Sequence, residues 1–486
     1  MSNNSTNTSG IRMKDKIGYA LGDVGSLLVF GLVNTFLQIF YTDKFGITPL
    51  VVMLIMIIAR VWDAINDPIW GRIVDNAPSK PGRRYKKWLL YLCLPLAFSS
   101  VLMFIDVNGW FHLSNVACIA YAIVSYIIFG MLYTGTNIPY GSMSSVITSD
   151  DKERNALSIF RSVGSTLGGF GPMIVNFFVW DKVEGVSVLN STKLIIGVSI
   201  MAVLSVVCAI LCYKLSEERI IVQPRSKQEK PKGETLRVLK NLLKTRSFVI
   251  ISIVGMLFLA AQMFQTTYNM YVFKVFFNKP GLATLSTVCQ YLPVAIVMFF
   301  SGKLVRKFGR KEVCAFGLLF TAICFGILAV IPVGAVARGT LMWIFLAVSL
   351  LAGLGNAFIF LMIWALANDS IDDYFVKTKS HDEATAYSIF TFMRKLGQTL
   401  AAVIVNISLI AIGYGQSAEW APTEAEATSM YYQSIIIPAA LSLIMFLLLM
   451  FVYPLSKKRV EALQGEKDAI LGETVVPQEQ EVEEKQ

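Results

Sequence analysis

Two carboxylates and an amide lie close together in one apolar stretch of the chain. Asp63, Asn66 and Asp67 are spaced i, i+3 and i+4, which puts their side chains on one face of a helix. Carboxylates on adjacent turns repel each other unless a cation lies between them, and oxygen ligands suit hard cations such as Na⁺. Because ionised groups inside an apolar helix are costly, these residues predict a metal site for Na⁺. The alternative is that Asp63 pairs with Arg60 and Asp67 with Arg72.

A second polar face lies in a later apolar stretch. Tyr133, Asn137 and Tyr140 share one side of a helix, and Thr134 shares a side with Asn137. Aromatic rings can stack on the faces of sugars and amides can bind their hydroxyls, so this face favours carbohydrate binding. Packing between helices uses the same residue types and is the competing explanation.

Three basic residues lie inside other apolar stretches. Arg161 is about two turns into one of them, where it could reach the membrane surface or donate to substrate hydroxyls. Arg394 and Lys395 are deep in another and point about 100° apart. At least one of the two is expected to line a cavity or to pair with Asp63 or Asp67.

Small residues follow Arg161 in the same stretch. Gly164, Gly168 and Gly169 lack a side chain, and small residues in membrane helices allow a neighbouring helix to approach closely. They predict tight helix packing beside Arg161.

The composition indicates a protein that is solvated by lipid. Of 486 residues, 55% are hydrophobic and only 16% are charged, and the mean hydropathy is +0.59. A soluble domain carries about a quarter charged residues. The net charge of +10 lies in segments that flank the apolar spans, where basic residues set membrane orientation, so nucleic acid is not expected as a partner.

The apolar spans predict an all-α membrane protein of about twelve helices in two halves of six. We expect an N-terminal segment at 1–16, a first bundle at 17–214, a linker at 215–246, a second bundle at 247–455 and a disordered tail at 456–486. The expected spans are 17–41, 50–74, 88–106, 113–146, 156–180, 192–214, 247–275, 284–304, 312–333, 341–367, 384–412 and 429–454.

Two basic loops match each other in the two halves. One reads GRIVDNAPSKPGRRYKK from Gly71 and the other reads GKLVRKFGRKE from Gly302. Their spacing resembles the loop signature of the major facilitator superfamily, and matched loops are what parallel transporter repeats predict. The alternative is that the basic residues of both loops only set the membrane orientation. On either reading these loops are cytoplasmic, and both termini are expected in the cytoplasm as well.

Several motifs together resemble the glycoside–pentoside–hexuronide:cation symporters. They are RVWDAINDPIWG, TNIPYG, NDSIDDY and YSIFTFMRKLGQ, and the resemblance runs from about Gly18 to Leu455. The family's cation ligands match Asp63, Asn66, Asp67 and Thr134, and its basic and hydroxyl sugar contacts match Arg161, Thr391 and Lys395.

The chain departs from the melibiose permeases of that family at four positions. Counted without gaps, their two sugar-binding aspartates fall on Leu27 and Asn137, and their two tryptophans fall on Gly141 and Phe360. Loss of the carboxylates would leave Arg161, Arg394 and Lys395 less compensated. An anionic sugar such as a hexuronide, or a neutral pentoside held by Asn137, is therefore expected rather than melibiose.

The resemblance implies a secondary active transporter that couples sugar to Na⁺, with H⁺ or Li⁺ as alternatives, and that holds no resident cofactor. It implies a multi-pass protein of the bacterial inner membrane, and we expect a monomer. A lysolipid carrier is the alternative within transport. The spans carry no HExxH, GxSxG or paired Cys and His motif, so an enzyme is not expected.

Overall fold

A computed structural model describes residues 11–77, 83–148, 151–183, 185–220, 234–379, 383–415, 422–467 and 469–470. Within it the chain forms two compact units. The first unit comprises Met1–Gln228, Asn278–Thr284 and Leu409–Ala421, and the second comprises Glu229–Phe277, Leu285–Ser408 and Pro422–Gln486.

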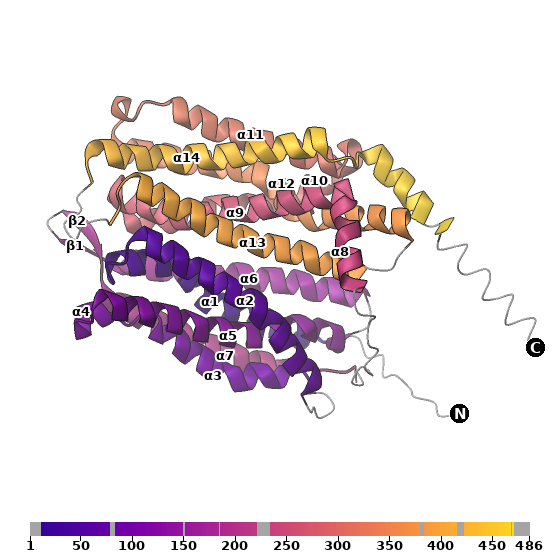
Figure 1. Ribbon diagram of the computed structural model, residues 1–486, viewed down its shortest axis with the longest axis horizontal. Helices are drawn as coiled ribbons and strands as arrows, with labels where there is room; N and C mark the ends of the chain where they lie inside the picture. The colour runs from indigo at the N-terminus through magenta and orange to yellow at the C-terminus, as the bar shows by residue number, and fades with distance from the viewer. Residues whose placement is uncertain are drawn as a thin grey trace, which may run out of the picture. The chain divides into compact units, whose positions relative to one another are not determined.

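The first unit is a helix bundle with one short hairpin (Figure 1). Helix α1 packs on α6 and α7, α3 packs on α5 and α7, and α2 packs on α5. The antiparallel strands β1 (Trp180–Val183) and β2 (Val186–Leu189) join α6 to α7. The helices are α1 (Met13–Asp43), α2 (Pro49–Asn76), α3 (Lys86–Leu102), α4 (Val107–Phe111), α5 (Asn115–Ile147), α6 (Asp151–Phe178) and α7 (Ser191–Leu215).

Glycines let α6 approach α1 closely. A Cβ on Gly164 would lie 2.3 Å from the carbonyl oxygen of Ala20, and one on Gly168 would lie 2.8 Å from that of Val24. The predicted close packing is confirmed at these two positions, but it is wrong for Gly169, where a Cβ would meet nothing within 4 Å.

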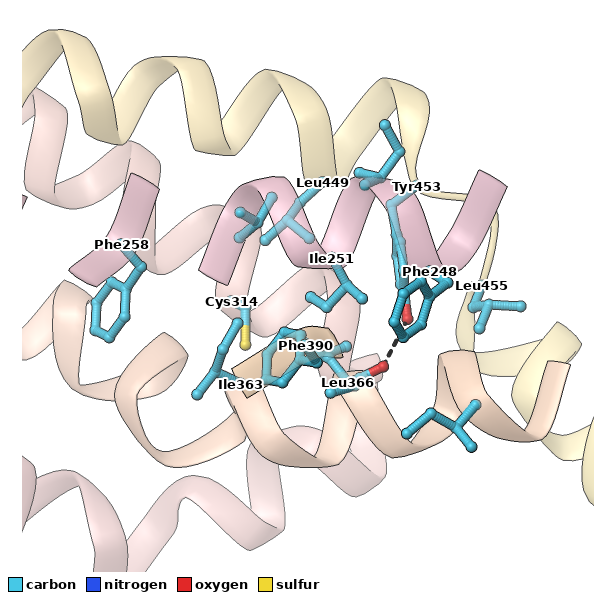
Figure 2. Close-up of a cluster of buried hydrophobic side chains, with 14 of the residues drawn as sticks. Phe248, Ile251, Phe258, Cys314, Ile363, Leu366, Phe390, Leu449, Tyr453 and Leu455 are labelled. Carbon is cyan, nitrogen blue, oxygen red and sulfur yellow. Dashed lines mark hydrogen bonds between the residues drawn. The ribbon is translucent and has the colours of Figure 1, made fainter. Parts of the chain in front are cut away.

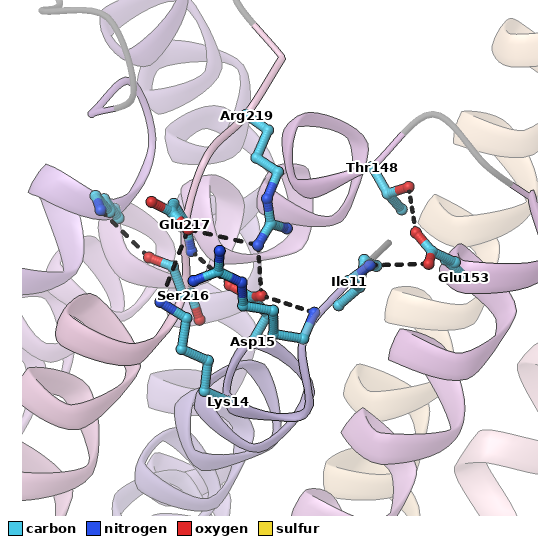
Figure 3. Close-up of polar contacts among 10 residues, drawn as sticks. Ile11, Lys14, Asp15, Thr148, Glu153, Ser216, Glu217 and Arg219 are labelled. Carbon is cyan, nitrogen blue, oxygen red and sulfur yellow. Dashed lines mark hydrogen bonds and ion pairs between the residues drawn. The ribbon is translucent and has the colours of Figure 1, made fainter. Parts of the chain in front are cut away.

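The start of α1 is held by a polar network (Figure 3). Asp15 is fully buried, and its carboxylate accepts hydrogen bonds from Arg219 Nη2 at 2.6 Å and from the backbone N–H of Glu217 at 3.0 Å. Lys14 adds an ion pair to Glu217 at 3.8 Å. Because a buried carboxylate is stable only when it is paired, this network fixes α1 to the segment that follows α7.

The second unit is also a helix bundle, in which α11 packs on α12 and α14, and α9 packs on α12 and α14. Helix α10 begins and α13 ends within the first unit. The helices of the second unit are α8 (Glu234–Lys244), α9 (Arg246–Val275), α10 (Ala283–Phe308), α11 (Arg310–Val330), α12 (Arg338–Thr378), α13 (Glu383–Ala411) and α14 (Glu424–Leu447). A π-helical turn over Leu448–Val452 extends α14. Two 3₁₀ turns occur, at Pro280–Leu282 and Val333–Ala335.

A buried apolar cluster joins α8, α9, α11, α12, α13 and α14 of the second unit, and Figure 2 shows part of it. Phe248 of α9, Leu366 of α12 and Phe390 of α13 are almost fully buried in it. The Tyr453 hydroxyl, beyond α14, satisfies its polarity by donating to the carbonyl oxygen of Leu366 at 3.1 Å.

Helix also occurs in the segment that we expected to be a linker and in the segment that we expected to be a disordered tail. Helix α8 occupies part of the expected linker at 215–246, buries Val238 and Leu242 in the same apolar cluster, and lies across the long helices of its unit (Figure 1). Residues 457–467 of the expected disordered tail are helical, and Lys467 pairs with Asp372 at 2.6 Å. Residues 221–233 and 471–486 lie outside the described part of the chain.

Ten of the described helices are long and apolar enough to cross a membrane. Two other expected spans are not among these ten. The span 88–106 overlaps α3, which has only 17 residues, and the span 156–180 overlaps α6, which is rich in Gly and Ser. Large apolar side chains face outward from both units, such as Val116 at 77% exposed and Phe299 at 83%. Such exposure suits a surface that is covered by lipid.

Candidate functional site

The predicted cation ligands lie together where α2 packs on α5. Thr134 Oγ1 donates a hydrogen bond to Asp67 Oδ1 at 3.3 Å. Asn66 is 1% exposed, and its Nδ2 has no hydrogen-bond partner within the described residues. A Cβ on Gly130 of α5 would lie 3.0 Å from Asp63 Oδ1. Helix α5 therefore comes against both carboxylates of α2.

The competing ion pair is present in the same place. Arg60 Nη1 lies 3.3 Å from Asp63 Oδ2. This pair offsets the negative charge of Asp63. Two carboxylates, an amide and a hydroxyl offer the oxygen ligands that hard cations prefer.

A second cluster forms where α1, α5 and α6 meet. Arg161 Nε lies 3.4 Å from Asp23 Oδ1, and Arg161 Cζ lies 5.2 Å from the centroid of the Tyr140 ring. Asp23 is 7% exposed and also accepts a hydrogen bond from Ser165. The Tyr140 hydroxyl donates to the carbonyl oxygen of Tyr19 at 2.7 Å. Tyr140 is 1% exposed. Its ring therefore packs against Arg161 and is not open to a ligand.

Asp23 is a residue that our sequence analysis missed. Counting without gaps put the family's helix-one carboxylate on Leu27, whereas Asp23 lies one helical turn earlier in α1. The expectation that Arg161 lacks a compensating carboxylate is therefore wrong. A lone aspartate inside an apolar span is a costly group, and that signal was available in the sequence.

The other predicted residues of the first unit line the same side of α5. Tyr133 stacks on Phe30 of α1, with ring centroids 4.5 Å apart, and on Phe129 at 5.9 Å. Asn137 is half-buried one turn further on. Phe30 was not predicted from the sequence.

In the second unit, the guanidinium of Arg394 on α13 packs over the ring of Trp364 on α12. Arg394 Cζ lies 4.6 Å from the centroid of Trp364, on which Tyr387 also stacks at 5.2 Å. Arg394 Nε has no hydrogen-bond partner within the described ranges. A cation over the face of a tryptophan is favoured by the ring's charge distribution, so Trp364 orients the guanidinium.

The remaining predicted residues of the second unit surround this pair or lie one turn away. Thr391 Oγ1 donates to the carbonyl oxygen of Tyr387 at 3.0 Å, and Lys395 is exposed. Phe360 is 39% exposed and meets Tyr291 edge to face at 6.0 Å. Trp364 lies one turn after Phe360 and was not predicted.

The expected pairing of Arg394 or Lys395 with Asp63 or Asp67 would join residues of different units and stays a prediction. Each unit assembles its own group of candidate residues. The first unit holds Asp63, Asn66, Asp67 and Thr134, with Asp23 and Arg161, and the second holds Trp364 with Arg394.

Comparisons with known proteins identify the family. Residues 18–457 match the model of the MFS/sugar transport protein family, and the chain therefore belongs to that family. It is 26% identical to the uncharacterized symporter YnaJ of Bacillus subtilis (strain 168) over 465 residues, which are 95% of this chain and 96% of that protein. It is 27% identical to the glucuronide carrier protein homolog of Escherichia coli (strain K12) over 469 residues, 93% and 94% of the two chains.

The fold agrees with a solved transporter. The crystal structure of a D-xylose–proton symporter superposes with a TM-score of 0.62 at 14% identity, covering 91% of this chain and 97% of that one. The predicted all-α major facilitator fold is confirmed, as is the resemblance to glycoside:cation symporters. The protein is a multi-pass membrane transporter and not an enzyme. The lysolipid alternative finds no support in these comparisons.

Proposed function

We propose that the protein is a symporter that carries a sugar glycoside, pentoside or hexuronide together with a monovalent cation by alternating access. The observation that carries this proposal is the gathering of Asp63, Asn66, Asp67 and Thr134 inside two apolar helices. Charged groups are retained inside a membrane when an ion pathway needs them. We propose further that the carrier lies in a bacterial inner membrane with both termini cytoplasmic, and that it acts as a monomer.

Na⁺ is the cation that fits this group best. All four side chains can contribute oxygen, the ligand atom that a hard cation such as Na⁺ prefers. H⁺ and Li⁺ are the alternatives. A proton would need one carboxylate and would leave Asn66 and Thr134 without a direct role, whereas Li⁺ would use the same ligands.

In the first unit, the Asp23–Arg161 pair supplies both acceptors and donors to a substrate. A paired carboxylate and guanidinium can bind neighbouring sugar hydroxyls without a change in net charge. Tyr133 lies on the adjacent face of α5 and supplies an aromatic surface. This group of residues suits the hydroxyl groups of a sugar, and it does not by itself demand an anion.

In the second unit, Arg394 supplies the positive charge. Its Nε lacks a hydrogen-bond partner within the described residues, and an ionised donor of this kind binds carboxylates strongly. One relative is named as a homolog of a glucuronide carrier. We therefore propose a sugar acid as substrate, with Arg394 as a group that can bind its acid, and a neutral pentoside as the alternative.

An uptake panel tests the function and its substrate together. Labelled glucuronide, xyloside, melibiose and lactose are offered to transporter-deficient cells that express the protein, with Na⁺ or with choline in its place. We expect Na⁺-stimulated uptake of the glucuronide and little uptake of melibiose. Uptake of neutral galactosides alone would contradict the proposed substrate, and the absence of any sugar uptake from well-expressed protein would contradict the function.

A further inference from the structure

An apolar groove runs along the surface of the second unit between α10, α11 and α12. Its volume is about 440 Å³, and five phenylalanines line it, Phe300, Phe308, Phe316, Phe320 and Phe358. Phe308 and Phe316 are more than half exposed, at 51% and 56%. An exposed apolar surface of this composition marks an interaction site for an apolar group.

The length of the groove matches one lipid chain. Its lining on α10 extends from Val297 to Phe308, which corresponds to roughly 16 Å at the rise of an α-helix. Half of a bilayer's hydrocarbon core is about 15 Å thick. An acyl chain that enters at one end would therefore reach the middle of the bilayer at the other.

Positive charge gathers at the Phe308 end of the groove. Lys303, Arg306 and Lys307 occupy the last turns of α10, and Lys307 Nζ lies 5.1 Å from the centroid of the Phe308 ring. Lys457 Nζ donates to the carbonyl oxygen of Arg306 at 2.6 Å, but it also pairs with Glu461 at 4.0 Å and so adds no net charge there. Within the described ranges, no carboxylate pairs with the three basic residues of α10.

We propose that this groove is a binding site for an anionic glycerophospholipid. One acyl chain lies on the phenylalanines, and the phosphate lies between Lys303 and Lys307. Basic groups beside membrane helices attract anionic lipid headgroups, while the apolar lining accepts the tail. The lipid is a bound constituent of the second unit and not the transported solute, so this site is independent of the proposed sugar transport.

Native mass spectrometry of the full-length protein, purified in detergent, tests the site. The protein is titrated with dioleoyl phosphatidylglycerol or dioleoyl phosphatidylcholine. We expect one phosphatidylglycerol to be retained and phosphatidylcholine to be retained about tenfold less. The variant Lys303→Gln/Lys307→Gln should lose about tenfold in phosphatidylglycerol occupancy. The control Lys240→Gln/Lys244→Gln removes the same charge from exposed positions of α8 and should keep wild-type occupancy.

A second variant tests the tail contact. Phe316→Ser alters an exposed side chain, so the bundle should remain folded. It should weaken binding of the dioleoyl lipid and leave binding of a dihexanoyl phosphatidylglycerol unchanged. Equal retention of the two dioleoyl lipids by the wild type, or wild-type retention by the Lys303→Gln/Lys307→Gln variant, would overturn the proposal. A dimer that forms through this face and excludes lipid would overturn it as well.

Discussion

At the scale of single residues, the chain keeps costly polar groups where a packed helix bundle needs none. Asp23 and Arg161 neutralise each other inside the first unit, and Asp63, Asn66 and Asp67 lie on one face of α2. A carboxylate in hydrocarbon is tolerated when it has a partner or a function. The first of these groups is an ion pair, and the second offers a cation the oxygen atoms of two carboxylates and an amide.

Replacing Asp23 should change which sugars the carrier prefers. Asp23→Asn removes the counter-charge from Arg161 while keeping the hydrogen-bonding shape, so the first unit gains positive charge. We expect lower uptake overall, by about tenfold, because Arg161 loses the carboxylate that pairs with it in the site. The ratio of uptake of a glucuronide to that of a xyloside should rise.

The control for that prediction is the neutral pair Asp23→Asn/Arg161→Gln, which restores charge balance. Its level in the membrane should match the wild type, while its uptake stays low because both hydroxyl contacts are changed. The measurement is KM for each sugar in cells of matched expression. An unchanged glucuronide-to-xyloside ratio in Asp23→Asn would show that Arg161 does not sense substrate charge.

At the scale of elements, the contact of α1 with α6 decides whether Asp23 and Arg161 meet. Gly164 faces the backbone of Ala20, three residues before Asp23 along α1. A side chain at Gly164 would push the two helices apart. The buried Asp15–Arg219 pair holds the start of α1 in place, so the helix has little freedom to move aside.

A matched pair of glycine substitutions tests this dependence. Gly164→Ala places a Cβ 2.3 Å from the carbonyl oxygen of Ala20, whereas Gly169→Ala places one in open space. Overpacking of this kind costs about 1–3 kcal/mol, so Gly164→Ala should lower the melting temperature and reduce uptake. Gly169→Ala should do neither. Equal melting temperatures for the two variants, measured in detergent, would contradict the packing described for α1 and α6.

Much of this architecture can be predicted from the sequence. Membrane helices must make all their backbone hydrogen bonds internally, and they are recognisable in the sequence as long apolar runs. The i, i+3, i+4 spacing of Asp63, Asn66 and Asp67 likewise fixes a shared face within one helix. Which residues of two neighbouring helices face each other cannot be predicted from the local sequence of either helix. Asp23 and Trp364 each lie one turn from the position that ungapped counting indicated, and only helix packing reveals that Asp23 reaches Arg161 and Trp364 reaches Arg394.

Segments outside the long spans were also predicted less well. Helix α8 is short and polar overall, and its structure depends on Val238 and Leu242 packing into the apolar cluster of the second unit. The helix at 457–467 depends in the same way on contacts such as Lys467 with Asp372. Short helices have little stability of their own, so their existence cannot be read from local pattern alone.

At the scale of the whole molecule, the account requires the cation and the sugar to act on one transport cycle. If cation binding raises the affinity for sugar, sugar binding must raise the affinity for the cation by the same factor. One Na⁺ that crosses a potential of 100 mV contributes about 2.3 kcal/mol, which corresponds to roughly fifty-fold accumulation. Accumulation of sugar against its gradient is therefore the property that separates a symporter from a passive carrier.

The most direct test is uptake by purified protein in liposomes with an imposed inward Na⁺ gradient. The account predicts that labelled glucuronide accumulates above its outside concentration in the wild type. In Asp63→Asn, the Na⁺ stimulation should vanish while the protein keeps its wild-type elution profile and melting behaviour. Accumulation in Asp63→Asn that responds to Na⁺ as strongly as the wild type would contradict the assignment of the cation site. Wild-type protein that only equilibrates every sugar in the panel under Na⁺, Li⁺ or H⁺ gradients would contradict symport itself.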